Sequence, residues 1–288
     1  MEKLLEKSEL SAKTITNYTN AVKRLNKMLG DEVQHASNAD IIKTIKEQEL
    51  TPSAKQTLLN VGLVIKKAFG DDVKSLEEYR AELAEAIKMH TADVVNPALK
   101  KELPSLAVLE KFTNQLYADG KYVDYIINFL LLTGVRNQDL DLIIKKDDKD
   151  LDEDDNYLII EKSKIRYVRG NYKTAKTYGE KTVVFNTRKF TDAVKDVLGE
   201  HESRYLLSNV TNSRISETSL NKYISTRTYN NIGQGKYFKV LTTSKKTDNE
   251  KLSEIRGTNP DTMEKHYNMK FKNLAGKAAK AKKEKKTE

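Results

Sequence analysis

The segment YVDYIINFLLL, residues 122–132, is apolar on nearly every side. A helix with no polar face has to be surrounded by other elements, so this segment predicts a buried core helix. The chain continues as TGVRNQDL, which puts Arg136 at the end of that helix and Asp139 and Leu140 at the expected start of the next one. Packing of the buried helix therefore fixes the backbone that carries Arg136.

Residues 1–90 have the pattern of amphipathic helices. Apolar residues recur at helical spacing up to Gly30, again from Thr51-Pro52 up to Gly70, and once more over residues 75–90. The apolar stripes consist of Ile15, Tyr18, Val22, Leu25 and Leu29; of Leu58, Val61, Ile65 and Phe69; and of Leu76, Leu83 and Ile87. The opposite faces carry lysines, among them Lys13, Lys55 and Lys66. We therefore predict a helical N-terminal domain with basic outer faces.

Residues 91–104 interrupt the helical periodicity and contain Pro97 and Pro104, so we predict a linker there. The second domain is expected to span residues 105–272, followed by a basic, disordered tail at 273–288. Residues 156–168 and 180–186 are rich in β-branched residues and predict strands, whereas most of the remainder follows a helical pattern. The predicted fold class is therefore mainly α with a small β-sheet, an α+β fold.

Composition excludes several kinds of site. The 288 residues include no cysteine, which excludes disulfides and thiolate metal ligands, and the four histidines are too scattered in sequence to predict a zinc site. No apolar run reaches the roughly 18 residues of a membrane span, and the charged N-terminus shows no secretory signal. We therefore expect an intracellular protein without a membrane partner. The acidic stretch KKDDKDLDEDD is expected to be a solvated loop rather than a metal site.

The net charge of +9 favours a polyanionic partner. Residues 271–288 hold seven lysines and two glutamates, and their net charge of +5 is more than half of the excess. This tail is expected to be a solubilising extension, a nucleic-acid arm or a nuclear import signal. Arg136 adds a more specific feature, because a guanidinium with a fixed backbone can hold a phosphate through two hydrogen bonds. The alternative is an arginine paired with Asp139 or with a nearby carbonyl.

Three short motifs resemble those of the tyrosine recombinases, the phage-type integrases that cut and rejoin DNA. TGVRNQDL resembles their TG-x-R-x-x-E-L box, whose arginine contacts the scissile phosphate and is Arg136 here. NYKTAKTYGEKTVVF resembles the β-hairpin that carries their catalytic lysine, which is Lys173 or, as the nearby alternative, Lys176. IRGTNPDTMEKHY resembles the segment in which their nucleophilic tyrosine follows a glycine, with Gly257 and Tyr267 in those places. The opening SAKTITNY resembles the start of their N-terminal core-binding domain.

The resemblance implies a helical core-binding domain and a catalytic domain that close around double-stranded DNA as a clamp. Tyr267 would form a 3′-phosphotyrosine bond without metal, ATP or another cofactor, and four copies would assemble in a synapse on DNA. Lys13, Lys55, Lys66 and Lys176 would contact the DNA. The chain would then be a site-specific recombinase or integrase of a virus or a mobile element, located on DNA in the host cytoplasm or nucleus.

Two places depart from the family pattern. The family's His-x-x-Arg box is replaced by GKYFKVLTT, in which Lys236 and Lys239 are the best match, and we assign Lys239 to the second phosphate-binding position. Thr258 stands where the family has a histidine after the glycine. Lys236, Arg256, Thr258 and His266 are the expected auxiliary residues at this position, and Arg227 is a further candidate.

Alternatives follow from these departures. A non-catalytic DNA-binding protein derived from the recombinase fold would keep the two domains and lose the second phosphate-binding position. A type IB topoisomerase shares the tyrosine chemistry and is the more distant alternative. If Tyr267 is not the nucleophile, Tyr237 is the next tyrosine to consider.

Overall fold

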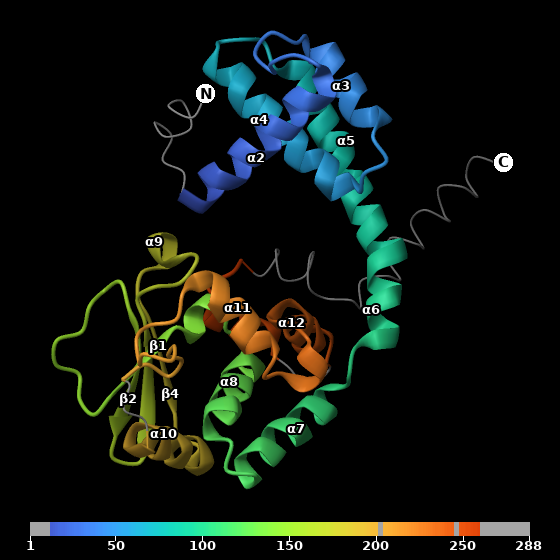
Figure 1. Cartoon of the computed structure of the whole chain (residues 1–288). Coiled ribbons are helices and arrows are strands. Elements are labelled where there is room, and N and C mark those ends of the chain that lie inside the picture. Colours follow the sequence, from blue (N-terminus) through green and yellow to red (C-terminus); the bar gives the residue numbers. More distant parts are fainter. Residues whose placement is uncertain (1–11, 201–203, 245–247, 260–288) are drawn as a thin grey trace. The chain divides into compact units, whose positions relative to one another are not determined.

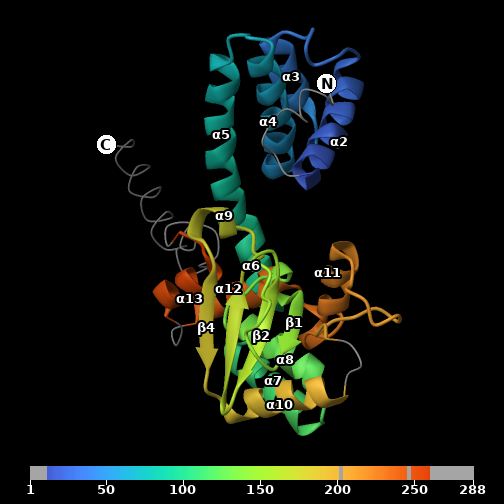
Figure 2. The ribbon, with the colours of Figure 1, turned by 90° about the vertical axis from the view of Figure 1, so that its left-hand side faces the viewer.

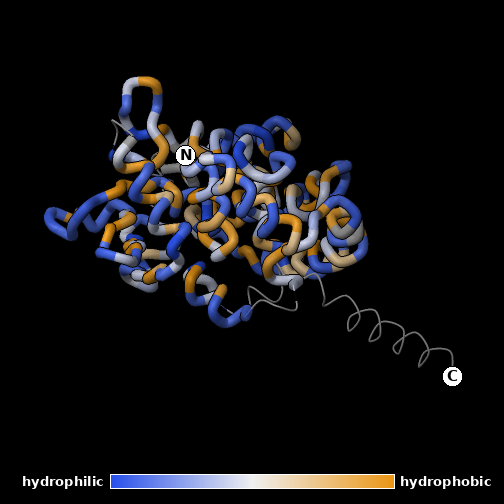
Figure 3. Tube along the Cα trace, turned by 90° about the horizontal axis from the view of Figure 1, so that it is seen from below, coloured by the Kyte–Doolittle hydropathy of each residue, from blue (hydrophilic) through white to orange (hydrophobic). Residues whose placement is uncertain are grey.

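The computed structural model describes residues 12–200, 204–244 and 248–259 (Figure 1). The chain divides into two compact units, residues 1–101 and 102–288. Each unit has a hydrophobic core of its own. Hydrophobic and hydrophilic residues alternate along the turns of the helices, as Figure 3 shows, which is the pattern of helices with one face on a core.

The first unit is built from helices α2 (Ala12–Leu29), α3 (Asn38–Glu47), α4 (Pro52–Ala68) and α5 (Lys74–His90). The predicted apolar stripes supply much of its core, which includes Val22, Leu25, Leu58, Val61, Leu76 and Leu83. Thr51 caps α4 as predicted, since its Oγ1 accepts a hydrogen bond from the Ala54 N–H. The prediction that Phe69 belongs to the apolar stripe of α4 is wrong. The helix ends at Ala68, and Phe69 is 51% exposed.

The segment predicted as a linker, residues 91–104, is helical for most of its length. A π-helical turn, η1 (Thr91–Val95), leads into α6 (Asn96–Glu102). Pro97 lies where the π-helical turn passes into α6, and the chain is helical without a gap from Lys74 to Glu102. Pro97 therefore does not interrupt the helical backbone here.

The second unit surrounds α8 (Tyr122–Leu132), in which Tyr125, Ile126, Ile127, Asn128, Leu130 and Leu131 are buried. The prediction of a buried core helix is confirmed. The other helices described in this unit are α7 (Leu106–Ala118), α9 (Ala175–Tyr178), α10 (Arg188–Glu200), α11 (Glu217–Ser225), α12 (Gln234–Thr243) and α13 (Asn249–Arg256). Two 3-10 turns, η2 (Gln138–Leu140) and η3 (Tyr229–Asn231), accompany them.

Four strands of the described chain form one mixed sheet in the order β1-β2-β3-β4 (Figure 2). β1 (Leu142–Lys145) is parallel to β2 (Asn156–Glu161), and β3 (Lys164–Arg169) is antiparallel to both β2 and β4 (Lys181–Phe185). The stretch predicted as strand at 156–168 is a hairpin that turns at Lys162-Ser163. β1 replaces the helix expected from Asp139 onward, because the chain makes one 3-10 turn and then pairs with β2. A mainly α fold with a small β-sheet is confirmed.

Candidate active site

Arg136 lies in the loop after α8, and hydrogen bonds hold it at both ends. Its backbone N–H donates to Asp139 Oδ2 at 3.0 Å. Its guanidinium donates from Nη1 to the Arg256 carbonyl at 2.6 Å and from Nη2 to Thr258 Oγ1 at 2.9 Å. Both partners expected from the sequence, Asp139 and a carbonyl, are therefore used, but by different ends of the residue.

The segment of residues 255–258, at the end of α13, receives a side chain on each of three successive carbonyls. The Ile255 carbonyl accepts from Arg169 Nη2, the Arg256 carbonyl from Arg136 Nη1, and the Gly257 carbonyl from Thr174 Oγ1. The last carbonyls of a helix lack partners within it and form the negative end of its dipole, which favours cationic donors. Gly257 ends α13 in the left-handed region, at φ 59°. Side chains from three other segments thus converge on this helix end.

Lys173 lies in the connection between β3 and β4, and its two neighbours hold this connection against Gly257. A Cβ atom on Gly257 would lie 2.8 Å from Tyr172 Cε2 and 2.9 Å from Thr174 Oγ1, so glycine is what leaves room for them. Lys173 itself is exposed, as is Lys176 in α9. The β3–β4 connection and Arg136 therefore meet on the same helix end.

A buried ion pair lies beside Arg136. Arg169, the last residue of β3, donates from Nη1 to Asp139 Oδ2 at 3.0 Å, and both side chains are 0% exposed. The Tyr167 hydroxyl donates to the Asp139 carbonyl at 2.6 Å. Arg169, Tyr172 and Thr174 were not among the predicted site residues. Charge alone did not distinguish Arg169, because β3 also carries Lys164 and Arg166.

Arg256 faces the interior, and its assignment as an auxiliary residue stays a prediction. It is 3% exposed, and its Nη1 donates to the Gly134 carbonyl at 2.9 Å. Its guanidinium carbon lies 3.6 Å from the centre of the Phe238 ring. A guanidinium used in this way stabilises the packing of α13 against α12. The backbone carbonyl of Arg256 belongs to the candidate site, because it accepts the hydrogen bond from Arg136.

Helix α12 carries the two lysines found where the family has His-x-x-Arg. Gln234, at its start, accepts a hydrogen bond from the Asn137 N–H at 3.1 Å, so the helix begins beside the loop that follows α8. Lys236 forms an ion pair with Glu102 at 3.6 Å. Lys239 is half-buried, and burial lowers its pKa. The assignment of Lys239 to the second phosphate-binding position stays a prediction.

The two tyrosines considered as nucleophiles differ in what the structure says of them. Tyr267, with its neighbour His266, lies outside the described residues. Tyr237 is 0% exposed in α12, its hydroxyl donates to Asn128 Oδ1, and burial raises its pKa to about 12. A hydroxyl held in the core by a side chain of α8 is not placed to attack DNA, so Tyr237 is no longer an alternative.

Lys66, one of the lysines predicted to contact DNA, does not lie on an exposed helix face. Its side chain is 7% exposed, pairs with Asp71 at 2.8 Å and donates to the Gln34 carbonyl at 3.0 Å. The helical pattern predicts an exposed face at Lys66, but Asp71 in the turn after α4 and Gln34 between α2 and α3 both contact its side chain. Lys55 is partly buried and donates to a carbonyl of α3 at 2.7 Å, and Lys13 lies in α2.

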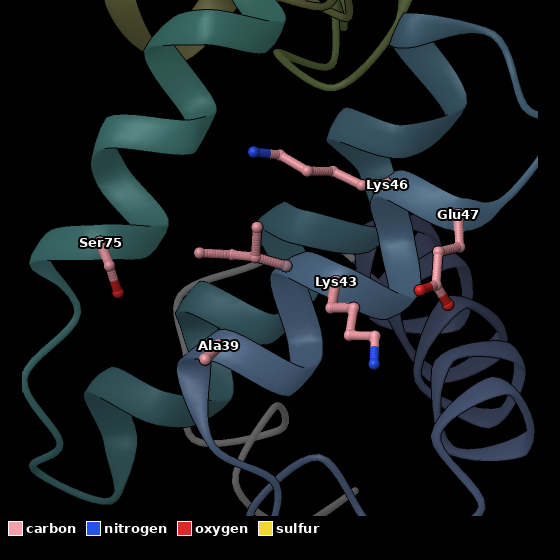
Figure 4. A pocket seen from close by; sticks show the side chains of 6 residues that line it. Ala39, Lys43, Lys46, Glu47 and Ser75 are labelled. Carbon is pink, nitrogen blue, oxygen red and sulfur yellow. The ribbon is translucent and has the colours of Figure 1, made fainter.

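Each unit also has a surface cavity. One of about 510 Å³ lies between α3 and α5 and is lined by Ala39, Ile42, Lys43, Lys46, Glu47 and Ser75 (Figure 4). The other, of about 450 Å³, is lined mainly by apolar residues of α7, α8, β4, α12 and α13. Neither cavity is lined by Arg136 or Lys173, and the second one shares only Ile255 with the candidate active site.

Within the described ranges, none of the helices has both the length and the apolar character of a membrane span. No three His, Asp or Glu side chains of these ranges are grouped so that they could hold a metal ion.

Similarity to known proteins is weak. The sequence matches no protein-family model, and no curated protein matches it significantly. Among solved structures, a crystal structure of XerA recombinase is similar to this chain with a TM-score of 0.40 and 14% sequence identity. The similarity covers 97% of this chain and 96% of that one. A likeness this weak does not establish membership of a family.

Proposed function

We propose that this protein cleaves and rejoins DNA as a tyrosine recombinase, with Tyr267 as the nucleophile. The observation that carries the proposal is the convergence of Arg136 and the connection bearing Lys173 on residues 255–258. Tyr267 follows this segment by nine residues. Contacts therefore link three motifs that lie far apart in sequence. Lys173 follows Arg136 by 37 residues, and Tyr267 follows Lys173 by 94 residues. If the motifs occurred by chance, nothing would require them to meet.

In the proposed reaction, the hydroxyl oxygen of Tyr267 attacks the phosphorus of a DNA phosphodiester. A bond forms between this oxygen and phosphorus, the hydroxyl proton passes to solvent, and the bond from phosphorus to the 5′ oxygen breaks. The 3′-phosphotyrosine conserves the energy needed for rejoining. Arg136 and Lys239 stabilise the charge that develops on the non-bridging oxygens. Lys173, or Lys176 in its place, gives a proton to the leaving 5′ oxygen.

In this proposal, double-stranded DNA binds both a core-binding domain at 1–90 and a catalytic domain at 105–272. Four copies of the protein assemble in the synapse. Lys13, Lys55 and Lys176 contact phosphates in this proposal, so binding weakens steeply as the salt concentration rises. Lys236, Thr258 and His266 act as auxiliary groups at the second phosphate-binding position. Integration or excision of a viral or mobile element is the corresponding biological role.

A nicked suicide substrate tests the proposal, because the loss of a short 5′ fragment traps the covalent intermediate. The wild-type protein is expected to form a protein–DNA adduct that survives denaturation, and Tyr267→Phe is expected to bind the same duplex without forming one. Tyr237→Phe is the matched control and is expected to keep the adduct, since this hydroxyl is buried. An adduct from Tyr267→Phe would contradict the proposal.

A non-catalytic DNA-binding protein is the second candidate, and one observation favours it. The guanidinium of Arg136 donates to Arg256 and Thr258 within the chain, and α12 carries lysines where the family has His-x-x-Arg. A cation at the C-terminal end of a helix stabilises that end, so Arg136 also has a purely structural role available. Duplex binding by the wild-type protein without adduct formation would select this candidate.

A further inference from the structure

Arg169 is a fully buried arginine that the proposed reaction does not use. Its Nη1 donates to Asp139 Oδ2 at 3.0 Å, and its Nη2 donates to the Ile255 carbonyl. Its guanidinium carbon lies 5.5 Å from the ring centre of Tyr167 and 5.2 Å from that of Tyr172. One side chain at the end of β3 therefore contacts the loop after α8, the end of α13 and the start of the β3–β4 connection.

The two hydrogen bonds of Arg169 act on the two ends of Arg136. Asp139 Oδ2, which Arg169 contacts, also accepts the hydrogen bond from the Arg136 backbone N–H. The Ile255 carbonyl, its other acceptor, precedes by one residue the Arg256 carbonyl that receives the Arg136 guanidinium. Arg169 thus holds both the backbone from which Arg136 extends and the helix end that its guanidinium contacts.

The ion pair is a poor source of stability by itself. Asp139 Oδ1 and Arg169 Nε are both buried and have no hydrogen-bond partner among the described residues. The desolvation of two buried charges can exceed their attraction, and apolar replacements of such pairs are often as stable as the pair. A role in positioning therefore accounts for this pair better than a role in stability.

We infer that Arg169 is a positioning residue, which holds Arg136 in the orientation that a scissile phosphate requires. The inference rests on the proposed function, because it assigns Arg136 to the phosphate. Arg169 is buried and acts through Asp139 and the 255–258 segment, not through DNA. A misplacement of reacting groups by about 1 Å typically costs about 10²-fold in rate, so Arg169→Met is expected to slow adduct formation by about this factor. Duplex binding is expected to change little.

Two further variants keep the test decisive if Arg169→Met does not fold. Asp139→Leu/Arg169→Met fills the site with apolar groups of similar size, so the protein is expected to stay folded and to show the same loss of rate. Arg169→Lys keeps the charge but cannot donate to both acceptors as a planar guanidinium does, and its adduct formation is expected to be slower than that of the wild type. Arg214→Met is the matched control, because Arg214 also pairs with two carboxylates of this unit, at 2.9 and 2.7 Å. It is expected to keep the wild-type rate.

A change of substrate separates positioning from a loss of stability. In a scissile methylphosphonate, a methyl group replaces one charged non-bridging oxygen, so less charge remains for a guanidinium to stabilise. Arg136→Ala and Arg169→Met are both expected to lose less rate on this substrate than on the phosphate. On the phosphate, Arg136→Ala/Arg169→Met is expected to be no slower than Arg136→Ala alone. Equal losses on both substrates, or additive losses in the double variant, would overturn the inference.

The orientation of Arg136 can also be measured without activity. Rotation of its guanidinium, followed by NMR of the nitrogen-labelled full chain and assigned with Arg136→Lys, is expected to be slow in the wild type. It is expected to be fast in Arg169→Met and Arg169→Lys, and unchanged rotation would overturn the inference. If the wild-type protein binds DNA but forms no adduct, the proposed function fails, and the rotation rate alone decides whether Arg169 positions Arg136.

Discussion

Arg136 and Thr258 are 122 residues apart in sequence, and Nη2 of Arg136 donates a hydrogen bond to Oγ1 of Thr258 at 2.9 Å. Thr258 directly follows Gly257, where α13 has ended, and it is partly buried. The bond therefore joins the loop after α8 to the segment that leads towards Tyr267. At the place where the family has a histidine, this chain offers the arginine a hydroxyl acceptor.

Thr258→Val removes this acceptor and keeps the shape of the side chain. The free energy of unfolding is expected to fall by about 1 kcal/mol, because a partly buried charged donor loses its partner. Adduct formation is expected to slow, since the Arg136 guanidinium loses one of its contacts. Thr258→Ser keeps the hydroxyl and serves as the control for both effects. Urea unfolding and the suicide substrate measure them, and identical behaviour of the two variants would show that the hydrogen bond has no part in either.

Gly257→Ala is expected to destabilise the protein more than Gly120→Ala, although both glycines have a positive φ, 59° and 70°. A Cβ at Gly120 would meet nothing within 4 Å. Gly120→Ala therefore lowers the free energy of unfolding only through the strain of alanine in a left-handed backbone conformation, about 1–2 kcal/mol. At Gly257 a Cβ would also displace Tyr172 and Thr174. Urea unfolding of the two variants measures the difference. Equal losses would mean that the β3–β4 connection is not held at Gly257.

Most helices could be predicted because the information that specifies them is local. Residues 122–132 are apolar all round, and the stripes of α2 and α4 end at Gly30 and Gly70, whose positive φ is compatible with a helix end. Helix α3 was not predicted, because it is short and buries only Ile41 and Ile45, too few residues to establish a period. Strand β1 was missed because its four residues are defined by pairing with β2, which no local pattern encodes.

The candidate site could be predicted only in its local motifs. Arg136 and Gly257 each stand at a helix end that the sequence marks. Arg169 contacts residues 30 and 86 positions away, and Thr174 contacts one 83 positions away. Those contacts depend on how β3 and α13 pack, and the local sequence of neither element specifies it. Lys66 was misassigned for the same reason, since its burial is set by the turn after α4 rather than by its place on the helix.

Lys173→Ala and Lys176→Ala separate the two lysines that the sequence leaves open. Both lysines are exposed, but Tyr172 and Thr174 hold the connection of Lys173 at the end of α13. Lys173→Ala is therefore expected to slow adduct formation by about 10²–10⁴-fold, the usual contribution of a general acid, and Lys176→Ala by much less. Sulfur in place of the leaving 5′ oxygen should restore Lys173→Ala, because a thiolate leaves without a proton. Rescue of Lys176→Ala instead would move the acid to Lys176.

Lys239 is half-buried on α12, and burial lowers its pKa below the ordinary value of 10.5. As the second phosphate-binding group it has to be charged, so adduct formation is expected to fall as the pH rises through this lowered pKa. Lys239→Arg is expected to keep its activity over the same alkaline range, because a guanidinium stays protonated. Lys236→Arg is the matched control and is expected to keep the wild-type profile, since Lys236 pairs with Glu102 at 3.6 Å. A fall that begins at the same pH in Lys239→Arg as in the wild type would remove Lys239 from this role.

The same lysine predicts a pH dependence of stability that can be measured without DNA. Between its lowered pKa and 10.5, Lys239 binds fewer protons in the folded than in the unfolded protein, so its own contribution to the free energy of unfolding rises with pH over this window. This contribution is complete above 10.5 and is lost as the pH falls through the lowered pKa. Compared with the wild type in urea unfolding over this window, Lys239→Met is expected to lack this contribution and Lys236→Met to keep it. Loss of the contribution with unchanged adduct formation would mean that Lys239 is buried as described but does not bind the phosphate.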